Sequence, residues 1–205
     1  GSPYYAGIAR VMQAMMLGTT TDCWGNVPFT QAFRGTDNLN PAYDSQEQIY
    51  ATIQTMLDQA IQNLSTTEEQ NVLLPGGDDY LFQGDVARWR TLAYLLKARF
   101  HNHLSKRNPS GSATLALEAL DNAGIATLTA ADADVLTVHG AALNESNQWF
   151  QFENERGGYI VMGSYLVDTM TALADPRLAI YASPDENGGF SGSFVDAQNP
   201  GASTV

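Results

Sequence analysis

The sequence holds 205 residues, of which 44% are hydrophobic, so it can bury a sizeable core without disulfides. Ten lysines and arginines stand against 22 aspartates and glutamates, which gives a formal net charge of -12. A chain of this charge repels phosphate backbones and anionic lipid, so we expect neither a nucleic-acid partner nor electrostatic adhesion to membranes. Its single cysteine, Cys23, cannot form an internal disulfide.

No stretch approaches the roughly 18 consecutive apolar residues that a membrane-spanning helix needs. The N-terminus lacks the basic and apolar regions of an export signal, although such a signal could have been removed. The last residues, 199–205, are of turn type and close no element. We therefore expect a fragment of a longer chain.

Apolar spacing predicts two helices in the first third of the chain. Residues 4–17 carry an apolar stripe at helical spacing, and Gly18 follows as the expected C-terminal cap. Residues 44–64 form the clearest pattern, with one apolar face on a 3.6-residue period. Asp44 is the expected N-cap of this helix, because Glu47 stands three residues further on as in a capping box.

Three more helices are predicted further along the chain. Residues 85–105 are predicted as a helix, with Asp85 as the expected N-cap. Residues 112–123 have Ser112 as their expected cap, and residues 164–173 form a shorter helix.

The remaining segments are predicted as strand or loop. Residues 135–138 are a short strand candidate. Asp78 and Asp79 are adjacent carboxylates in a Gly-rich turn, which indicates a solvated turn more than a metal pair.

Two predicted loops, residues 19–43 and 144–158, are rich in aromatic and amide side chains. Sugars offer apolar C–H faces that stack on exposed rings and hydroxyls that pair with amides, so these loops are candidate carbohydrate sites. The competing interpretation is that the rings pack a core beneath the loops. The candidate ligand-binding residues are Trp149, Asn147, Gln148, Trp24 and Tyr43.

Motifs of catalysis are missing from the sequence. It holds no nucleophile elbow, no phosphate-binding glycine loop and no zinc-site spacing of Cys and His, so we expect no cofactor, no metal and no catalytic residue. A pair of carboxylates for glycoside hydrolysis stays open, because separation in space is not visible in sequence. Glu153 and Glu155, the candidates for such a pair, are interpreted as surface charges.

Four segments, in order, resemble motifs of the SusD/RagB family, the surface glycan-binding lipoproteins of Bacteroidetes. They are DCWGNVPFTQAF at residues 22–33, PAYDSQEQIY at 41–50, GDVARW at 84–89 and DPRL at 175–178. Each motif is weak alone, and the ordered set is specific. The resemblance does not identify which residues bind the ligand, because members of the family differ in the aromatic residues that bind sugar.

The resemblance implies a mainly α fold of tetratricopeptide-like helix pairs with long aromatic loops. We expect one SusD-like domain fragment over residues 1–205, with a helical core at about 4–123 and a loop-rich part at about 124–205.

It further implies a protein on the extracellular face of the outer membrane, held by a lipid anchor absent from this sequence. Such a protein binds oligosaccharide or another nutrient without catalysis and delivers it to a TonB-dependent, SusC-like transporter. A helical-repeat scaffold that binds proteins and has no sugar affinity is the main alternative, and an all-α glycoside hydrolase is a third.

Overall fold

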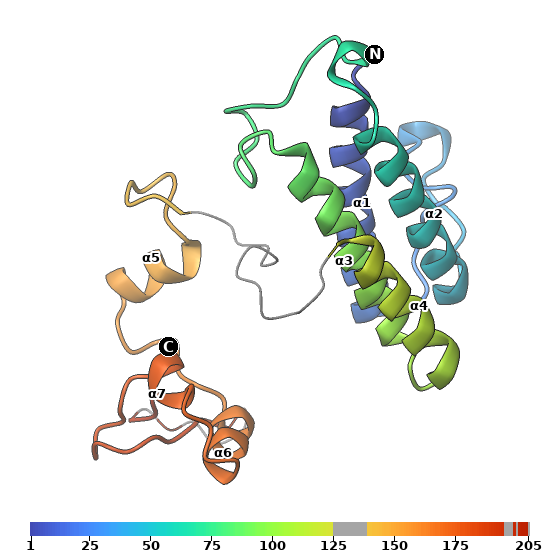
Figure 1. Ribbon diagram of the computed structural model, residues 1–205. Coiled ribbons are helices and arrows are strands. Elements are labelled where there is room, and N and C mark those ends of the chain that lie inside the picture. The colour runs from blue at the N-terminus through green and yellow to red at the C-terminus, as the bar shows by residue number, and fades with distance from the viewer. Residues whose placement is uncertain (125–138, 195–198, 200, 205) are drawn as a thin grey trace. The chain divides into compact units, whose positions relative to one another are not determined.

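The computed structural model describes residues 1–124, 139–194, 199 and 201–204. Within them the chain forms seven α-helices and two short 3-10 helices, and its extended pairings are isolated bridges (Figure 1). This confirms the predicted mainly α fold class. The chain divides into two compact units, residues 1–138 and 139–205. The single-domain organisation expected from the resemblance stays a prediction.

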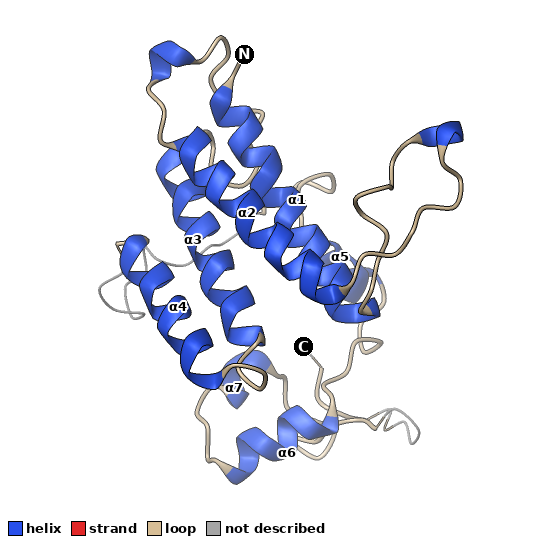
Figure 2. Ribbon diagram, turned by 90° about the vertical axis from the view of Figure 1, so that its right-hand side faces the viewer, coloured by secondary structure: helices blue, strands red, loops and turns tan. Residues whose placement is uncertain are grey.

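The first unit is built on four helices that lie side by side (Figure 2). Helices that are consecutive in sequence pack against each other: α1 on α2, α2 on α3 and α3 on α4. Helix α1 also contacts α3. The elements of this unit are α1 (Pro3–Trp24), η1 (Gly35–Asp37), α2 (Gln46–Leu64), η2 (Glu68–Gln70), α3 (Val86–His103) and α4 (Pro109–Asn122).

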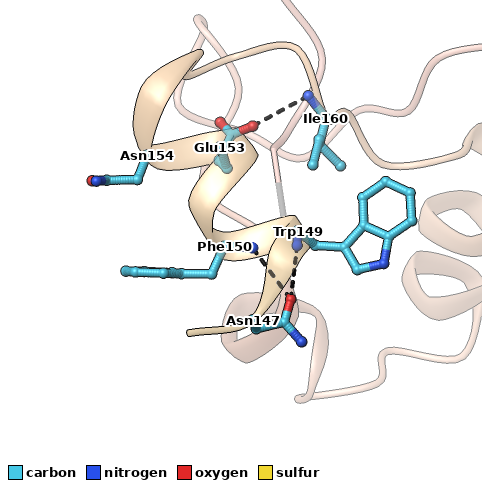
Figure 3. A pocket seen from close by; sticks show the side chains of 6 residues that line it. All are labelled: Asn147, Trp149, Phe150, Glu153, Asn154 and Ile160. Atoms are coloured by element: carbon cyan, nitrogen blue, oxygen red, sulfur yellow. Dashed lines mark hydrogen bonds between the residues drawn. The ribbon is translucent and has the colours of Figure 1, made fainter. Parts of the chain in front are cut away.

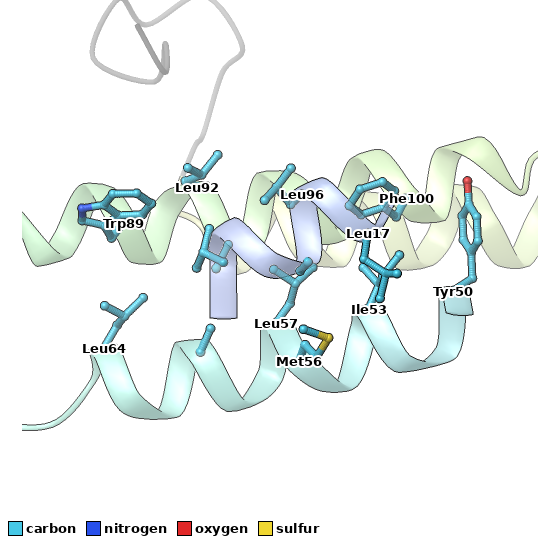
Figure 4. Close-up of a cluster of buried hydrophobic side chains, with 14 of the residues drawn as sticks. Leu17, Tyr50, Ile53, Met56, Leu57, Leu64, Trp89, Leu92, Leu96 and Phe100 are labelled. Atoms are coloured by element: carbon cyan, nitrogen blue, oxygen red, sulfur yellow. The ribbon is translucent and has the colours of Figure 1, made fainter. Parts of the chain in front are cut away.

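The core of the first unit lies between α1, α2 and α3 (Figure 4). The apolar stripe of α2 meets large rings and leucines of α3, of which Trp89 is 1% and Phe100 2% exposed. Each fully buried side chain of this size contributes roughly 1.5–3 kcal/mol, so this stripe fixes how the helices pack. The α2 residues in the core are Ile49, Tyr50, Ile53, Met56, Leu57, Ala60 and Leu64.

Helix α1 is longer than predicted, and the expected stop at Gly18 is wrong. The helix continues to Trp24 and ends at Gly25, whose φ of 73° lies in the left-handed region and whose N–H donates to the Thr21 carbonyl at 2.8 Å. Gly18 allows the Phe100 ring to pack closely against α1, because a Cβ at this position would lie 2.1 Å from Cζ of Phe100. The predicted loop at 19–43 therefore starts only after Trp24.

The N-cap of α2 is Ser45, so the assignment to Asp44 is wrong. Ser45 and Gln48 form a complete capping box, in which each side chain serves the backbone of the other. The Asp44 carboxylate instead accepts hydrogen bonds from the backbone of Phe29 and Thr30, at 2.9 and 2.8 Å, and from the Thr30 hydroxyl at 2.7 Å. These bonds hold the pKa of Asp44 below its ordinary value, with the Thr30 backbone as the largest cause.

The start of α3 agrees with the sequence and the start of α4 does not. Asp85 caps α3 as predicted, accepting from the Arg88 backbone at 3.1 Å. Helix α4 begins at Pro109 with Asn108 as its cap, because proline favours the first helical position. Ser112, the expected cap, is a buried residue inside this helix.

The segment before α3 is held down by Asp79, which is buried and not the solvated turn residue predicted. Its carboxylate accepts from the Trp89 indole at 2.6 Å and from the backbone N–H groups of Gly84, Leu81 and Phe82 at 3.0–3.2 Å. Burial acts to raise the pKa of Asp79, but these donors outweigh it and the pKa is lowered. The carboxylate thus ties the connector to α3.

The second unit is smaller. Its helices are α5 (Gln148–Glu155), α6 (Ser164–Ala172) and α7 (Leu178–Tyr181). A compact cluster joins α6 and α7 and consists of Met162, Val167, Met170, Leu178 and Ala182, with Phe190 beside it. Helix α6 matches the prediction at 164–173, whereas the predicted strand at 135–138 lies outside the described residues.

Candidate functional site

Helix α5 lies inside the segment predicted as an aromatic loop, so that prediction is wrong for this part. The cap is Asn147, whose side-chain oxygen accepts from the backbone of Trp149 at 2.9 Å and of Phe150 at 3.3 Å (Figure 3). The Gln151 amide braces the first turn through the Ser146 carbonyl and hydroxyl, at 2.9 and 2.6 Å. The sequence around Asn147 therefore fixes the two aromatic residues on a helical turn.

A hollow of about 830 Å³ borders α5 and the segment after it. Trp149 is 73% and Phe150 66% exposed, and no residue of α5 is buried. Trp149 and Ile160 point to one side of the helix, whereas Phe150 and Asn154 point to the other (Figure 3). The lining residues are Asn147, Trp149, Phe150, Glu153, Asn154 and Ile160.

Glu153 fixes the wall of this hollow. Its two carboxylate oxygens accept from the backbone N–H of Gly158 at 2.6 Å and of Ile160 at 3.2 Å, which folds the following segment back over α5. Next to this turn, the rings of Phe152 and Tyr159 meet edge to face with centroids 6.3 Å apart. Of the lining residues that the structure describes, Glu153 is the charged one, and both of its oxygens are engaged within the chain.

The structure brings together some of the predicted site residues and not others. Trp149 and Asn147 line the hollow, and Gln148 begins α5 without being part of the lining. Trp24 ends α1 and Tyr43 follows η1, so both belong to the first unit. Trp24, Tyr43 and Trp149 are each 73% exposed, so the competing interpretation that these rings pack a core is wrong for all three.

Sequence reasoning missed Phe150, Asn154 and Ile160 as lining residues and assigned Glu153 to the surface. The available signal was an asparagine followed two and three residues later by Trp149 and Phe150, which fits an N-cap. The part played by Ile160 depends on the fold of the turn, which the sequence pattern does not reveal.

A second polar cluster joins three helices of the first unit. The Tyr50 hydroxyl donates to Asp22 at 2.5 Å, and Nδ1 of His103 lies 3.1 Å from the other oxygen of the same carboxylate. Burial, followed by the Asp22 hydrogen bond, raises the pKa of Tyr50. Because each member contacts another member from a different helix, this cluster fastens α1, α2 and α3 together.

Two further features of the described residues bear on function. In residues 1–124 and 139–194, with 199 and 201–204, no three His, Cys, Asp or Glu side chains gather as a metal site would require. Over the same described part, no helix has the length and apolarity to span a bilayer.

Solved structures with a similar arrangement of helices include a chitin-binding protein and proteins described as SusD homologues. A chitin-binding protein matches with a TM-score of 0.75 and 22% identity, over 100% of this chain and 46% of its own. A SusD/RagB family protein from Bacteroides thetaiotaomicron matches with a TM-score of 0.78 and 25% identity, over 100% and 43%. A SusD homologue from Bacteroides vulgatus matches with a TM-score of 0.76 and 19% identity, over 99% and 42%.

The fold is therefore that of the SusD/RagB class. The chain belongs to the SusD-like_2 family, described as "Starch-binding associating with outer membrane", whose model matches residues 2–204. This confirms the resemblance drawn from the four motifs. The chain spans less than half the length of these solved proteins. No curated protein matches it in sequence.

Proposed function

We propose that this chain is part of a glycan-binding protein associated with the bacterial outer membrane, and that the α5 hollow holds the sugar. Membership of a family described as starch-binding supports this. The observation that carries the proposal is the indole of Trp149, which is 73% exposed on the edge of an 830 Å³ hollow. Exposed indoles are costly in water, and a sugar ring stacked on one recovers that apolar area.

The polar groups around the indole suit sugar hydroxyls. The side-chain amides of Asn147 and Asn154 lie on the lining and can both donate and accept hydrogen bonds. The side-chain oxygen of Asn147 caps α5 and its Nδ2 lies 3.5 Å from Nε2 of His139, so the remaining hydrogen of this NH₂ group is the one that can serve a ligand. Phe150 offers a second ring on the other side of the helix, which suits a chain of several sugar units.

The charge of the site favours neutral glycans. The described lining of the hollow holds no cationic side chain, Glu153 adds a negative charge, and the chain as a whole carries -12. An anionic glycan would meet repulsion with no basic group to offset it. We expect a maltooligosaccharide to bind at least tenfold more tightly than an oligogalacturonate of equal length, with the difference shrinking as salt is added.

Binding is proposed to occur without cleavage. Glycoside hydrolysis uses two carboxyl groups roughly 5–9.5 Å apart across the scissile bond. Among the described residues that line the hollow, Glu153 is the carboxylate, and both oxygens of that group hold backbone amides. A reducing-end assay on the bound glycan should show no turnover, and sustained release of new ends would favour the hydrolase alternative.

Delivery to a SusC-like TonB-dependent transporter, from a lipid-anchored position on the extracellular face, is the remaining part of the proposal. It rests on the family description, which places family members with the outer membrane. The test is affinity purification of the full-length protein from its native membrane. Recovery of such a channel supports delivery, and a protein that binds glycan yet never purifies with a channel contradicts it.

The binding proposal itself is tested by isothermal titration of the chain against neutral polysaccharide fragments, with starch-derived and chitin-derived oligosaccharides first. Saturable binding in the micromolar to millimolar range is expected, because the site is open and uses few polar contacts. Absence of heat with every neutral glycan, from a chain that is folded by circular dichroism, would contradict it and favour the protein-binding scaffold.

A further inference from the structure

A second hollow, of about 380 Å³, lies wholly within the first unit between α2, α3 and α4. Its polar lining comes from the first half of α2, the end of α3 and the connection to α4, with a leucine just after α3 and another on α4. It shares no residue with the α5 hollow. The lining residues that matter here are Gln46, Glu47, Gln54, His101, Arg107 and Leu115.

Gln54 is the unusual group in this lining. Its amide nitrogen donates to the Lys97 carbonyl over a long 3.4 Å, and its side-chain oxygen is buried with no hydrogen-bond partner. A buried acceptor without a donor is unfavourable, and native proteins rarely keep one. The bond that holds the amide is weak, and the hollow lies beside it. Turning the amide toward the hollow would let a ligand donor reach the orphaned oxygen.

The other groups set the chemistry of that ligand. Burial, followed by the charge of Lys97, lowers the pKa of His101, so its ring is neutral at neutral pH and can donate at one nitrogen and accept at the other. Glu47 and Arg107 contribute one charge of each sign. Such a lining favours a ligand without net charge, one that both donates and accepts hydrogen bonds. Leu104 and Leu115 add apolar surface.

We propose that this hollow binds a neutral, hydroxyl-bearing molecule of one or two sugar rings, with the Gln54 amide turned inward to accept from a ligand hydroxyl. The size supports a short ligand, because small-molecule sites run from roughly 300 to 1,000 Å³ and this one lies near the lower end. The inference goes beyond the proposed function, since the described lining of this hollow shares no residue with α5 and holds no exposed aromatic ring.

The test follows backbone and side-chain amides of the isotopically labelled chain by NMR during titration with maltose, chitobiose, glycine and glutamine. Sugars should shift the Gln54 side-chain amide and backbone amides near His101. Gln54→Met keeps the length of the side chain and removes its amide. It should weaken sugar affinity, measured from the backbone amides near His101, at least tenfold while leaving the shifts around Trp149 unchanged. Trp149→Ala should do the reverse.

The outcomes separate this inference from the proposed function. Shifts confined to α5 overturn the second site and leave the glycan proposal standing, whereas no shift with either sugar counts against both. Shifts at Gln54 with glycine or glutamine alone overturn the assigned ligand class. Leu115→Trp fills the same hollow from α4 and should also abolish the response, so the test does not depend on one variant folding well.

Discussion

Asp79 offers the sharpest test of how the first unit is held together. Replacing it with alanine leaves the indole N–H of Trp89 without its acceptor, in a side chain that is 1% exposed. Hydrogen bonds to a charged group contribute about 1.5–3 kcal/mol each, and three backbone N–H groups lose the same acceptor. Because these terms are not additive, we expect Asp79→Ala to lower the free energy of unfolding by about 3–5 kcal/mol.

The neighbouring residue supplies the control. Asp78 is exposed and bonds the Tyr5 hydroxyl at 2.6 Å and the backbone of Gly76 at 2.9 Å, so Asp78→Ala should have the small effect of a surface substitution. Urea unfolding, followed by circular dichroism and by tryptophan fluorescence, measures both variants. If Asp79→Ala costs no more than Asp78→Ala, with unchanged denaturant slope, the buried network does not stabilise the fold as described.

The lowered pKa of Asp79 adds a pH dependence of defined sign. Its folded pKa lies below the ordinary value of 3.8, so its stabilisation is fully present above that value and is lost as pH falls through the folded pKa. Asp79→Asn should therefore flatten the acid side of the stability curve between about pH 5 and 2. An acid limb with the same slope in the wild type and the variant would contradict this.

Three further substitutions have defined expected outcomes. Gly18→Ala should destabilise by about 1–3 kcal/mol in thermal melts despite its better helix propensity, because the new methyl overlaps Phe100; Phe100→Leu in the same chain should relieve the loss. A more stable Gly18→Ala protein would contradict that packing. Ser45→Ala should lower the free energy of unfolding by about 1 kcal/mol through loss of the α2 cap. An unchanged free energy would show that another residue caps α2. Asn147→Ala should weaken glycan binding several-fold in titrations by loosening the first turn of α5. Unchanged affinity would show that this turn does not contribute to the binding site.

The sequence predicted the helices whose apolar spacing is long and regular. The stripe of α2 extends over some five turns, so its interior was clear even though its first residue was misplaced. Caps were harder, because Asp44 and Ser45 are both good capping residues in adjacent positions. The choice between them depends on the Asp44 contacts with Phe29 and Thr30, which lie about 15 residues away in sequence.

Two errors came from residues that act through distant partners. Gly18 resembles a helix stop in sequence, yet it is needed because the Phe100 ring occupies the space of its side chain. Asp79 resembles a solvated turn residue, yet the Trp89 indole ten residues later buries and binds it. Neither partner can be identified from local pattern, because both depend on how α3 packs.

The candidate site was predicted in part. Exposed aromatic and amide side chains indicated Trp149 and Asn147, which line the α5 hollow. The helix itself was missed, because its eight residues are fewer than the roughly 11–18 residues over which apolar spacing identifies a helix. The placement of Glu153 and Ile160 depends on the turn after α5.

The most direct test of the account is a titration of the chain with a neutral oligosaccharide, comparing Trp149→Ala with Tyr165→Ala. Tyr165 is an aromatic residue of α6 that is 85% exposed and does not line the hollow, so it controls for loss of an exposed ring. We predict at least a tenfold loss of affinity for Trp149→Ala, equivalent to about 1.4 kcal/mol, and none for Tyr165→Ala. Glycan binding that survives Trp149→Ala unchanged would contradict the assignment of the site to α5.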